Sequence, residues 1–70
     1  MRTKPATKLL HEGELAAEVT VRLVETDDAW SPYLSVEDAR KLDEVRAALR
    51  RGDVQSAAKH ARVFRLTPIS

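Results

Sequence analysis

The chain has 70 residues and a mass of 7.8 kDa, about half of a typical domain, and is expected to form one small domain, residues 1–70, with a disordered tail at 1–5. It contains no cysteine, which excludes disulfides and thiolate metal sites. No apolar run approaches the roughly 20 residues of a membrane span, and the first residues lack the apolar stretch of a signal peptide. These features predict a cytoplasmic protein without a membrane segment.

The net charge of +1 hides an uneven distribution along the chain. Residues 26–38 carry four acidic side chains and no basic one, whereas residues 39–70 carry eight bases against three acids. The C-terminal half is therefore basic enough to attract nucleic acid or an acidic protein surface. Alternatively, these basic side chains lie on the solvent-exposed faces of two helices, where they form ion pairs with acidic side chains of the same helix.

Two β-strands are expected near the N-terminus. Apolar and polar residues alternate strictly from Leu15 to Leu23, which is typical of a half-buried strand that continues towards residue 25. Residues 6–11 form a second candidate strand, separated from the first by Glu12-Gly13, where glycine can adopt the positive φ of a tight turn. With these two residues as the loop, Leu10 would face Leu15 in a β-hairpin.

Residues 27–35 are expected to form a loop, since they contain Ser31-Pro32 and two adjacent acids. Two of the three aromatic residues of the chain, Trp30 and Tyr33, lie in this loop. They would either cap a thin core or be exposed as a contact site for a partner.

An α-helix follows, with Ser35 as its N-cap and an apolar stripe at three- and four-residue spacing. Gly52 supplies the left-handed residue that ends it, and Asp53 caps a second helix in which Val54, Ala57, Ala58 and Ala61 share one face. So short a connection predicts that the two helices fold back on each other. Residues 63–67 alternate again, which indicates a final strand stopped by Pro68.

The predicted fold is α+β, with a small antiparallel β-sheet packed against an α-helical hairpin. Its order is ββααβ, and the sheet consists of the β-hairpin and the C-terminal strand.

Nothing in the sequence indicates an enzyme. The two histidines, His11 and His60, have no nucleophile or ligand at a functional spacing, and no phosphate-binding or zinc-protease motif is present. Glu12 and Glu14 beside His11 make too weak a metal pattern without a second histidine. We therefore expect no catalytic residue, no cofactor and no metal.

One alternative function is DNA binding, in which strand 15–25 enters the major groove as in ribbon-helix-helix repressors. In that interpretation the strand or the basic helical half contacts nucleic acid. The candidate residues are Thr20, Arg22, Arg46, Arg50, Arg51, Lys59 and Arg62. Two features count against it, because about ten residues separate the strand from the first helix and the second helix is short.

The stretch W-S-P-Y-L-S-V-E-D-A-R-K-L-D-E-V-R-A-A-L-R-R-G-D, the closing A-R-V-F-R-L-T-P and the earlier L-L-H-E-G-E-L-A-A-E-V resemble a group of short bacterial proteins. Some members of that group are described as antitoxin-like components of type II toxin–antitoxin modules. The resemblance covers roughly residues 9 to 69. It implies a protein partner, namely a small toxin of the RelE/ParE kind or similar.

The leading functional hypothesis is therefore a non-enzymatic protein-interaction module that neutralises a small toxin. Such toxins are typically basic, so the candidate partner site is the acidic, aromatic stretch that consists of Asp27, Asp28, Trp30, Tyr33, Glu37 and Asp38. Besides DNA binding, a homodimer whose sheet continues across a two-fold axis remains an alternative, because a chain of this size has a marginal core.

Overall fold

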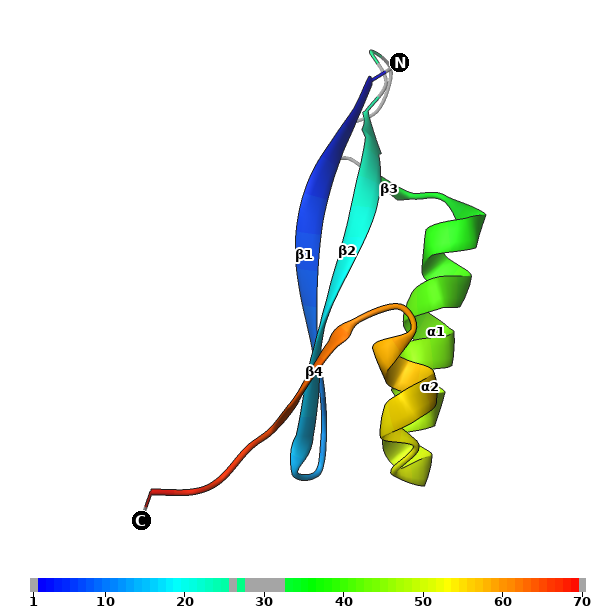
Figure 1. Cartoon of the computed structure of the whole chain (residues 1–70). Coiled ribbons are helices and arrows are strands. Elements are labelled where there is room, and N and C mark those ends of the chain that lie inside the picture. Colours follow the sequence, from blue (N-terminus) through cyan, green and yellow to red (C-terminus); the bar gives the residue numbers. More distant parts are fainter. Residues whose placement is uncertain (1, 26, 28–32, 70) are drawn as a thin grey trace.

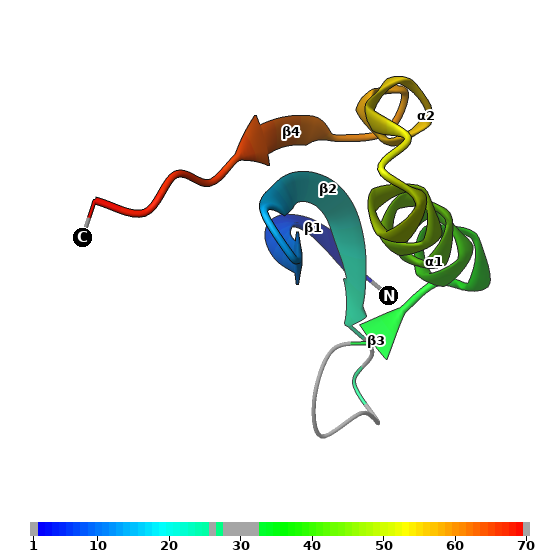
Figure 2. The same cartoon turned by 90° about the horizontal axis from the view of Figure 1, so that it is seen from below.

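The computed structural model describes residues 2–25, 27 and 33–69 as an antiparallel sheet with two helices on one side of it (Figures 1 and 2). The element order is β1-β2-β3-α1-α2-β4. The predicted α+β class is confirmed, and the order gains one short strand.

The N-terminal hairpin pairs β1 (Arg2–Glu12) with β2 (Leu15–Glu25) along their whole length. Its closing pair is Glu12 with Leu15, so the two-residue loop is Gly13-Glu14 and the predicted facing of Leu10 with Leu15 is wrong. Gly13 occupies the first loop position with a φ of 61°, the place where a type II′ turn needs positive φ. The loop therefore lies one residue later than predicted, which leaves Leu10 opposite Ala17.

The strand β1 begins at Arg2, so residues 2–5 pair with β2 where a disordered tail was expected. Arg2 and Lys4 both lie near the carboxylate of Glu25, at 3.8 and 3.7 Å. Because Pro5 cannot donate a backbone hydrogen bond, its place in an edge strand of the sheet is one that proline tolerates.

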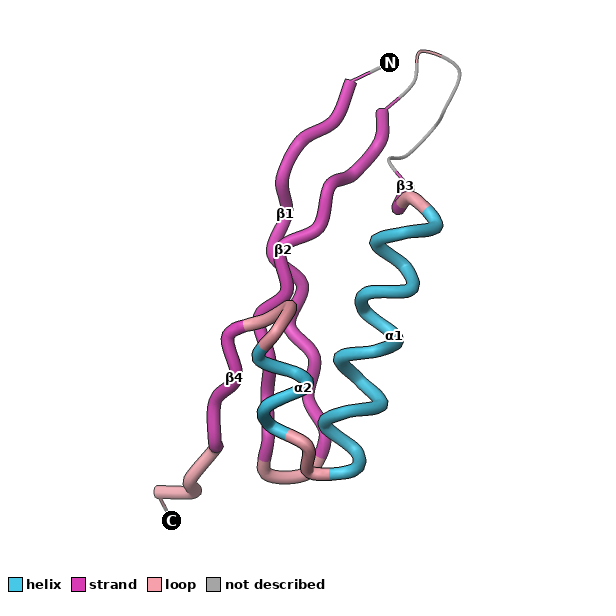
Figure 3. The backbone as a smooth tube through the Cα atoms, turned by 45° about the vertical axis from the view of Figure 1, so that its right-hand side comes forward, coloured by secondary structure: helices cyan, strands magenta, loops and turns pink. Residues whose placement is uncertain are grey.

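The central strand of the sheet is β2. On the side away from β1 it pairs with β4 (Arg62–Arg65) through residues 15–18, and with β3 (Tyr33–Leu34) through Leu23 and Val24. The loop predicted for residues 27–35 therefore includes a short strand at its end. After β4, the Leu66 N–H donates to the Glu14 carbonyl at 2.7 Å, and the chain then leads away from the body (Figure 3).

The helix α1 (Val36–Arg51) begins and ends at the predicted residues. The Ser35 hydroxyl accepts the Asp38 N–H at 3.1 Å, and Gly52 ends the helix with a φ of 72°. Asp53 caps α2 (Val54–Ala58), but that helix stops before Ala61 and is shorter than the alanine spacing predicts. Only Ala57 of the predicted face is buried, and Ala61 packs against the edge of the core.

The core lies between α1 and the face of the sheet that the helices cover. Val19 and Val21 of β2 and Val45 of α1 are its largest completely buried side chains. Side chains alternate between the two faces of a strand, so these valines define an inner row, whose other buried members in the sheet are Leu10, Leu15 and Ala17. We call the opposite side of the sheet the outer face.

No helix in the described part of the chain is both long and apolar enough to cross a membrane.

Replacing Leu49 by alanine tests the packing of α1 on the sheet. Leu49 is 3% exposed, and its truncation should cost about 2–5 kcal/mol, a large share of the stability of a domain this small. Urea unfolding followed by circular dichroism measures the loss. The control is Val36→Ala at a side chain that is 68% exposed, which should change the stability by less than about 0.5 kcal/mol; equal losses would contradict the packing.

The Asp53 cap predicts a pH-dependent difference between the protein and its Asp53→Ser variant. Hydrogen bonds from the Ser56 hydroxyl and N–H lower the pKa of Asp53 below its ordinary value of 3.8. A lowered pKa stabilises the folded state above the ordinary value and ceases to do so as the pH falls through the lowered one. The serine of the variant keeps a capping oxygen and does not titrate. The stability advantage of the unsubstituted protein over the variant in urea unfolding should therefore shrink as the pH falls below the ordinary value of 3.8 and through the lowered pKa of Asp53, and a constant difference would contradict it.

Candidate functional site

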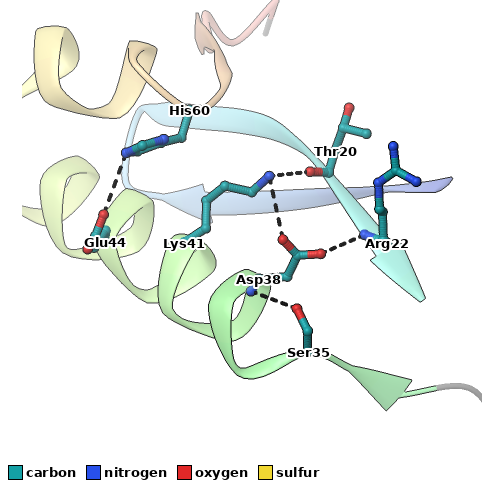
Figure 4. A network of polar contacts seen from close by, with 7 residues as sticks. All are labelled: Thr20, Arg22, Ser35, Asp38, Lys41, Glu44 and His60. Atoms are coloured by element: carbon teal, nitrogen blue, oxygen red, sulfur yellow. Dashed lines mark hydrogen bonds and ion pairs between the residues drawn. The ribbon is translucent and has the colours of Figure 1, made fainter. Parts of the chain in front are cut away.

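The edge of β2 that faces away from β1 is only partly paired, because β3 and β4 are both short. Side chains of α1 occupy the gap between these two strands. Residues 15–18 pair with β4 and residues 23–24 with β3, which leaves residues 19–22 without a strand on that side in the part of the chain that the structure describes. Two side chains of α1 reach the backbone there (Figure 4). The Lys41 ammonium donates to the Thr20 carbonyl at 2.7 Å, and the Arg22 N–H donates to the Asp38 carboxylate at 2.7 Å.

We call these two contacts the helix–strand bridge. The second oxygen of Asp38 lies 3.8 Å from the Lys41 nitrogen, so the two side chains also hold each other in place. Both are only partly exposed, at 19% for Asp38 and 30% for Lys41. Hydrogen bonds with a charged partner are stronger than neutral ones, so the bridge replaces part of a missing strand.

Sequence reasoning missed the bridge. It assigned Asp38 to a partner surface, because Asp38 belongs to the acidic stretch around Trp30 and Tyr33. The signal in the sequence was the spacing of Asp38, Lys41 and Val45, which are three and four residues apart. This spacing places the two polar side chains on the same side of α1 as the buried Val45. The gap along β2 depends on the lengths of β3 and β4, and the spacing of residues in α1 gives no information about those lengths.

The predicted acidic partner site is divided by the structure. Asp27, Tyr33 and Glu37 are exposed, whereas the carboxylate of Asp38 is engaged in the bridge. Asp28 and Trp30 lie outside the described residues.

The predicted nucleic-acid residues do not form one surface. Thr20 and Arg22 lie in the outer row of β2 and Arg62 in the outer row of β4, opposite Glu18. The other four belong to the helical layer, and they are Arg46, Arg50, Arg51 and Lys59.

The basic charge of the C-terminal half is largely balanced by carboxylates. Counted over the described residues, five of the eight basic side chains after residue 38 have a carboxylate oxygen within 4.0 Å. Three of these carboxylates come from the hairpin, in the pairs Arg50–Glu12, Arg65–Glu14 and Arg62–Glu18. Such exposed pairs contribute little to stability, but a phosphate would have to compete with each of them.

A shallow depression of about 400 Å³ lies beside the bridge and is lined by Lys41, His60, Arg62 and Glu18 among others. Its two cationic groups already have an acidic neighbour, since Asp38 lies 3.8 Å from Lys41 and Glu18 lies 4.0 Å from Arg62, and Glu44 lies 3.5 Å from His60. The depression therefore lacks the excess charge that would draw an anion. The other histidine, His11, bonds the Gly13 carbonyl at 2.8 Å across the hairpin turn. Among the described residues, no group of three or more histidine or acidic side chains is placed to hold a metal ion.

The outer face of the sheet carries exposed apolar side chains, which sequence reasoning did not assign to a site. Near the hairpin turn these are Leu9 of β1, Phe64 of β4 and Leu66 just beyond it, which are 68%, 36% and 44% exposed. Ala16 lies between His11 and Phe64 in the same row, and the Arg62 guanidinium lies 5.3 Å from the centre of the Phe64 ring. Tyr33 lies on the same face at its other end, opposite Val24. The alternation in residues 63–67 indicates that Phe64 and Leu66 lie on one side of the strand. It does not indicate which side of the sheet the helices cover.

Removing the carboxylate of the bridge should destabilise the fold. In the Asp38→Ala variant the Arg22 N–H loses its acceptor and the Lys41 ammonium loses an ion-pair partner. The loss should cost about 1–3 kcal/mol and speed amide exchange at Arg22. Urea unfolding and hydrogen exchange measure both effects. The Glu37→Ala control removes a neighbouring exposed carboxylate and should have little effect. Unchanged stability and exchange in Asp38→Ala would contradict a structural role for the bridge.

Comparisons with known proteins give no match. No family model, no curated protein and no solved structure is significantly similar to this chain.

Proposed function

We propose that the chain is a non-enzymatic protein-interaction module that binds a protein partner through the outer face of its sheet. The observation that carries this proposal is that three exposed apolar side chains, Leu9, Phe64 and Leu66, lie on the same face of the sheet, the one that the helices do not cover; we call these three residues the outer-face cluster. Apolar side chains on an uncovered sheet face mark an interaction surface more readily than single exposed ones do.

The composition of the outer face fits a protein rather than a nucleic-acid partner. Aromatic side chains are enriched in protein–protein contacts, and this face has one at each end, Phe64 near the hairpin turn and Tyr33 near the start of α1. The guanidinium of Arg62 stacks on Phe64, so a basic side chain near the cluster contributes area to it as well as charge.

A small toxin is the partner that we propose, and this step rests on the resemblance to antitoxin-like proteins. Toxins of this kind are typically basic, and the exposed Asp27 and Glu37 lie at the same end of the molecule as Tyr33. An acidic rim beside an apolar face would increase the rate of encounter with a basic partner.

The absence of enzymatic activity is part of the proposal. Both histidines have contacts that serve the fold, since His11 bonds the hairpin turn and His60 lies next to Glu44. Within the part of the chain that the structure describes, neither is paired with a serine, threonine or lysine in the way that an activated nucleophile requires.

Co-expression with the product of the adjacent reading frame tests the proposal, with growth rescue and the dissociation constant of the purified pair as readouts. The Phe64→Thr variant keeps a residue that favours strands and removes the ring, so it should weaken the complex at least about tenfold, or about 1.4 kcal/mol. The matched control is Val54→Thr on α2, since Val54 is 38% exposed against 36% for Phe64. It should leave the complex unchanged.

Three outcomes would overturn the proposal. The first is the absence of any complex with that product. The second is a complex that Asp27→Lys disrupts and Phe64→Thr does not, which would move the contact to the acidic stretch. The third is tight binding to duplex DNA that weakens steeply with salt, because that dependence is the mark of phosphate contacts.

A further inference from the structure

The strand β1 has a free edge, and this edge has a definite set of backbone groups. Along its 11 residues β1 pairs with β2 alone in the described structure, so it forms one border of the sheet. A long edge of this kind is a template for pairing with another strand.

The helix–strand bridge shows which residues of β1 point their backbone groups outwards. In an antiparallel pair, successive residues direct their N–H and C=O groups alternately towards the partner and away from it. Thr20 and Arg22 bond to α1 and therefore turn away from β1. Their partners across the ladder, Thr7 and Pro5, turn away from β2 in the same way. The outward set in β1 is thus Thr3, Pro5, Thr7, Leu9 and His11.

Pro5 limits the part of the edge that can pair. It lacks an N–H, so a strand laid across it would leave one carbonyl without a donor. In the segment from Thr7 to His11, every residue that points outwards has both a backbone N–H donor and a C=O acceptor. In its middle, Leu9 is 68% exposed, and its side chain lies on the outer face.

We propose that this segment pairs antiparallel with the same segment of a second copy, about a two-fold axis at Leu10. The inference goes beyond the proposed function, since it concerns the edge of the sheet rather than its outer face. Leu9 then faces His11 of the second copy, and the two Leu9–His11 pairs form about four backbone hydrogen bonds. Pro5 falls outside the new ladder.

The side chains of the inner row select this axis. In the monomer, Val63, Ala17 and Leu10 are neighbours across three strands of the sheet, and Ala17 and Leu10 are buried. With the axis at Leu10, the two Leu10 side chains meet, and this apolar row continues into the second copy. An axis at Leu9 would place Lys8 against Leu10, and an axis at Lys8 would place two lysines opposite each other.

Charge complementarity supports the same axis. Lys8 lies in the inner-facing row of β1, and its exposed ammonium makes no ion pair in the described structure. With the axis at Leu10, Lys8 of each copy is directly opposite Glu12 of the other, which gives two ion pairs per dimer. Glu12 already holds Arg50 at 3.3 Å, so its carboxylate is positioned before the second copy arrives. Opposite charges at facing positions of a ladder are stabilising, and like charges are destabilising.

A charge-exchange experiment tests this pairing. Sedimentation equilibrium of the full chain should show a dimer, and Lys8→Glu and Glu12→Lys should each weaken it at least tenfold, because each places like charges at both contacts. Mixed in equal amounts, the two variants should form a heterodimer, since each contact then joins a glutamate to a lysine. The Lys59→Glu control makes the same change of charge on α2 and should leave the dimer intact.

Circular dichroism of each variant shows that it is folded before it is mixed. A chain that is monomeric at all concentrations would overturn the inference, as would a dimer that is indifferent to Lys8→Glu and Glu12→Lys or a mixture of the two that stays monomeric. None of these results depends on the toxin complex, whose own readouts are growth rescue and partner affinity. A monomeric Lys8→Glu variant that still binds the partner would therefore separate the two proposals.

Discussion

The burial of the inner row of β2 is the constraint on which the rest of the molecule depends. Val19 and Val21 are completely buried against α1, where Val45 is equally inaccessible. Side chains alternate along a strand, so burying these valines places Thr20 and Arg22 on the outer face. Their backbone groups meet α1 at the sheet edge, where Asp38 and Lys41 complete the hydrogen bonding that β3 and β4 are too short to supply. One helix thus contributes both the core and part of the sheet edge.

The same arrangement explains why the charges of the sequence give a poor guide to the surface. The basic residues of the C-terminal half lie beside the acidic residues of the hairpin once β4 pairs with β2 and α1 packs on the sheet. On the outer face, exposed polar side chains such as Thr20 and Arg22 lie beside exposed apolar ones, and the apolar side chains are the basis of the proposed protein partner. The free edge of β1 adds a second surface, whose backbone groups are known because the bridge fixes the alternation of β2.

Much of the fold was predictable because its signals are local. The Ser35 cap, the Gly52 terminator and the Asp53 cap act within a few residues, and all three occur as expected. The alternation of residues 15–23 is likewise a property of one strand. The hairpin loop was predicted one residue too early, which moves the partner of Leu10 by two residues, because either Glu12 or Glu14 can share the two-residue loop with Gly13. The candidate site was less predictable, since the role of Asp38 depends on a strand 16 residues away in sequence.

The sequence by itself determined the class of the fold, the positions of α1 and the start of α2, and the existence of the N-terminal hairpin. These follow from caps, turns and periodicity, which short segments carry on their own. Only the tertiary structure decided which face of the sheet is covered, which cations are balanced by carboxylates, and that Asp38 completes a sheet edge. The physical reason is that each of these depends on a distance between segments far apart in the chain, and packing alone sets that distance.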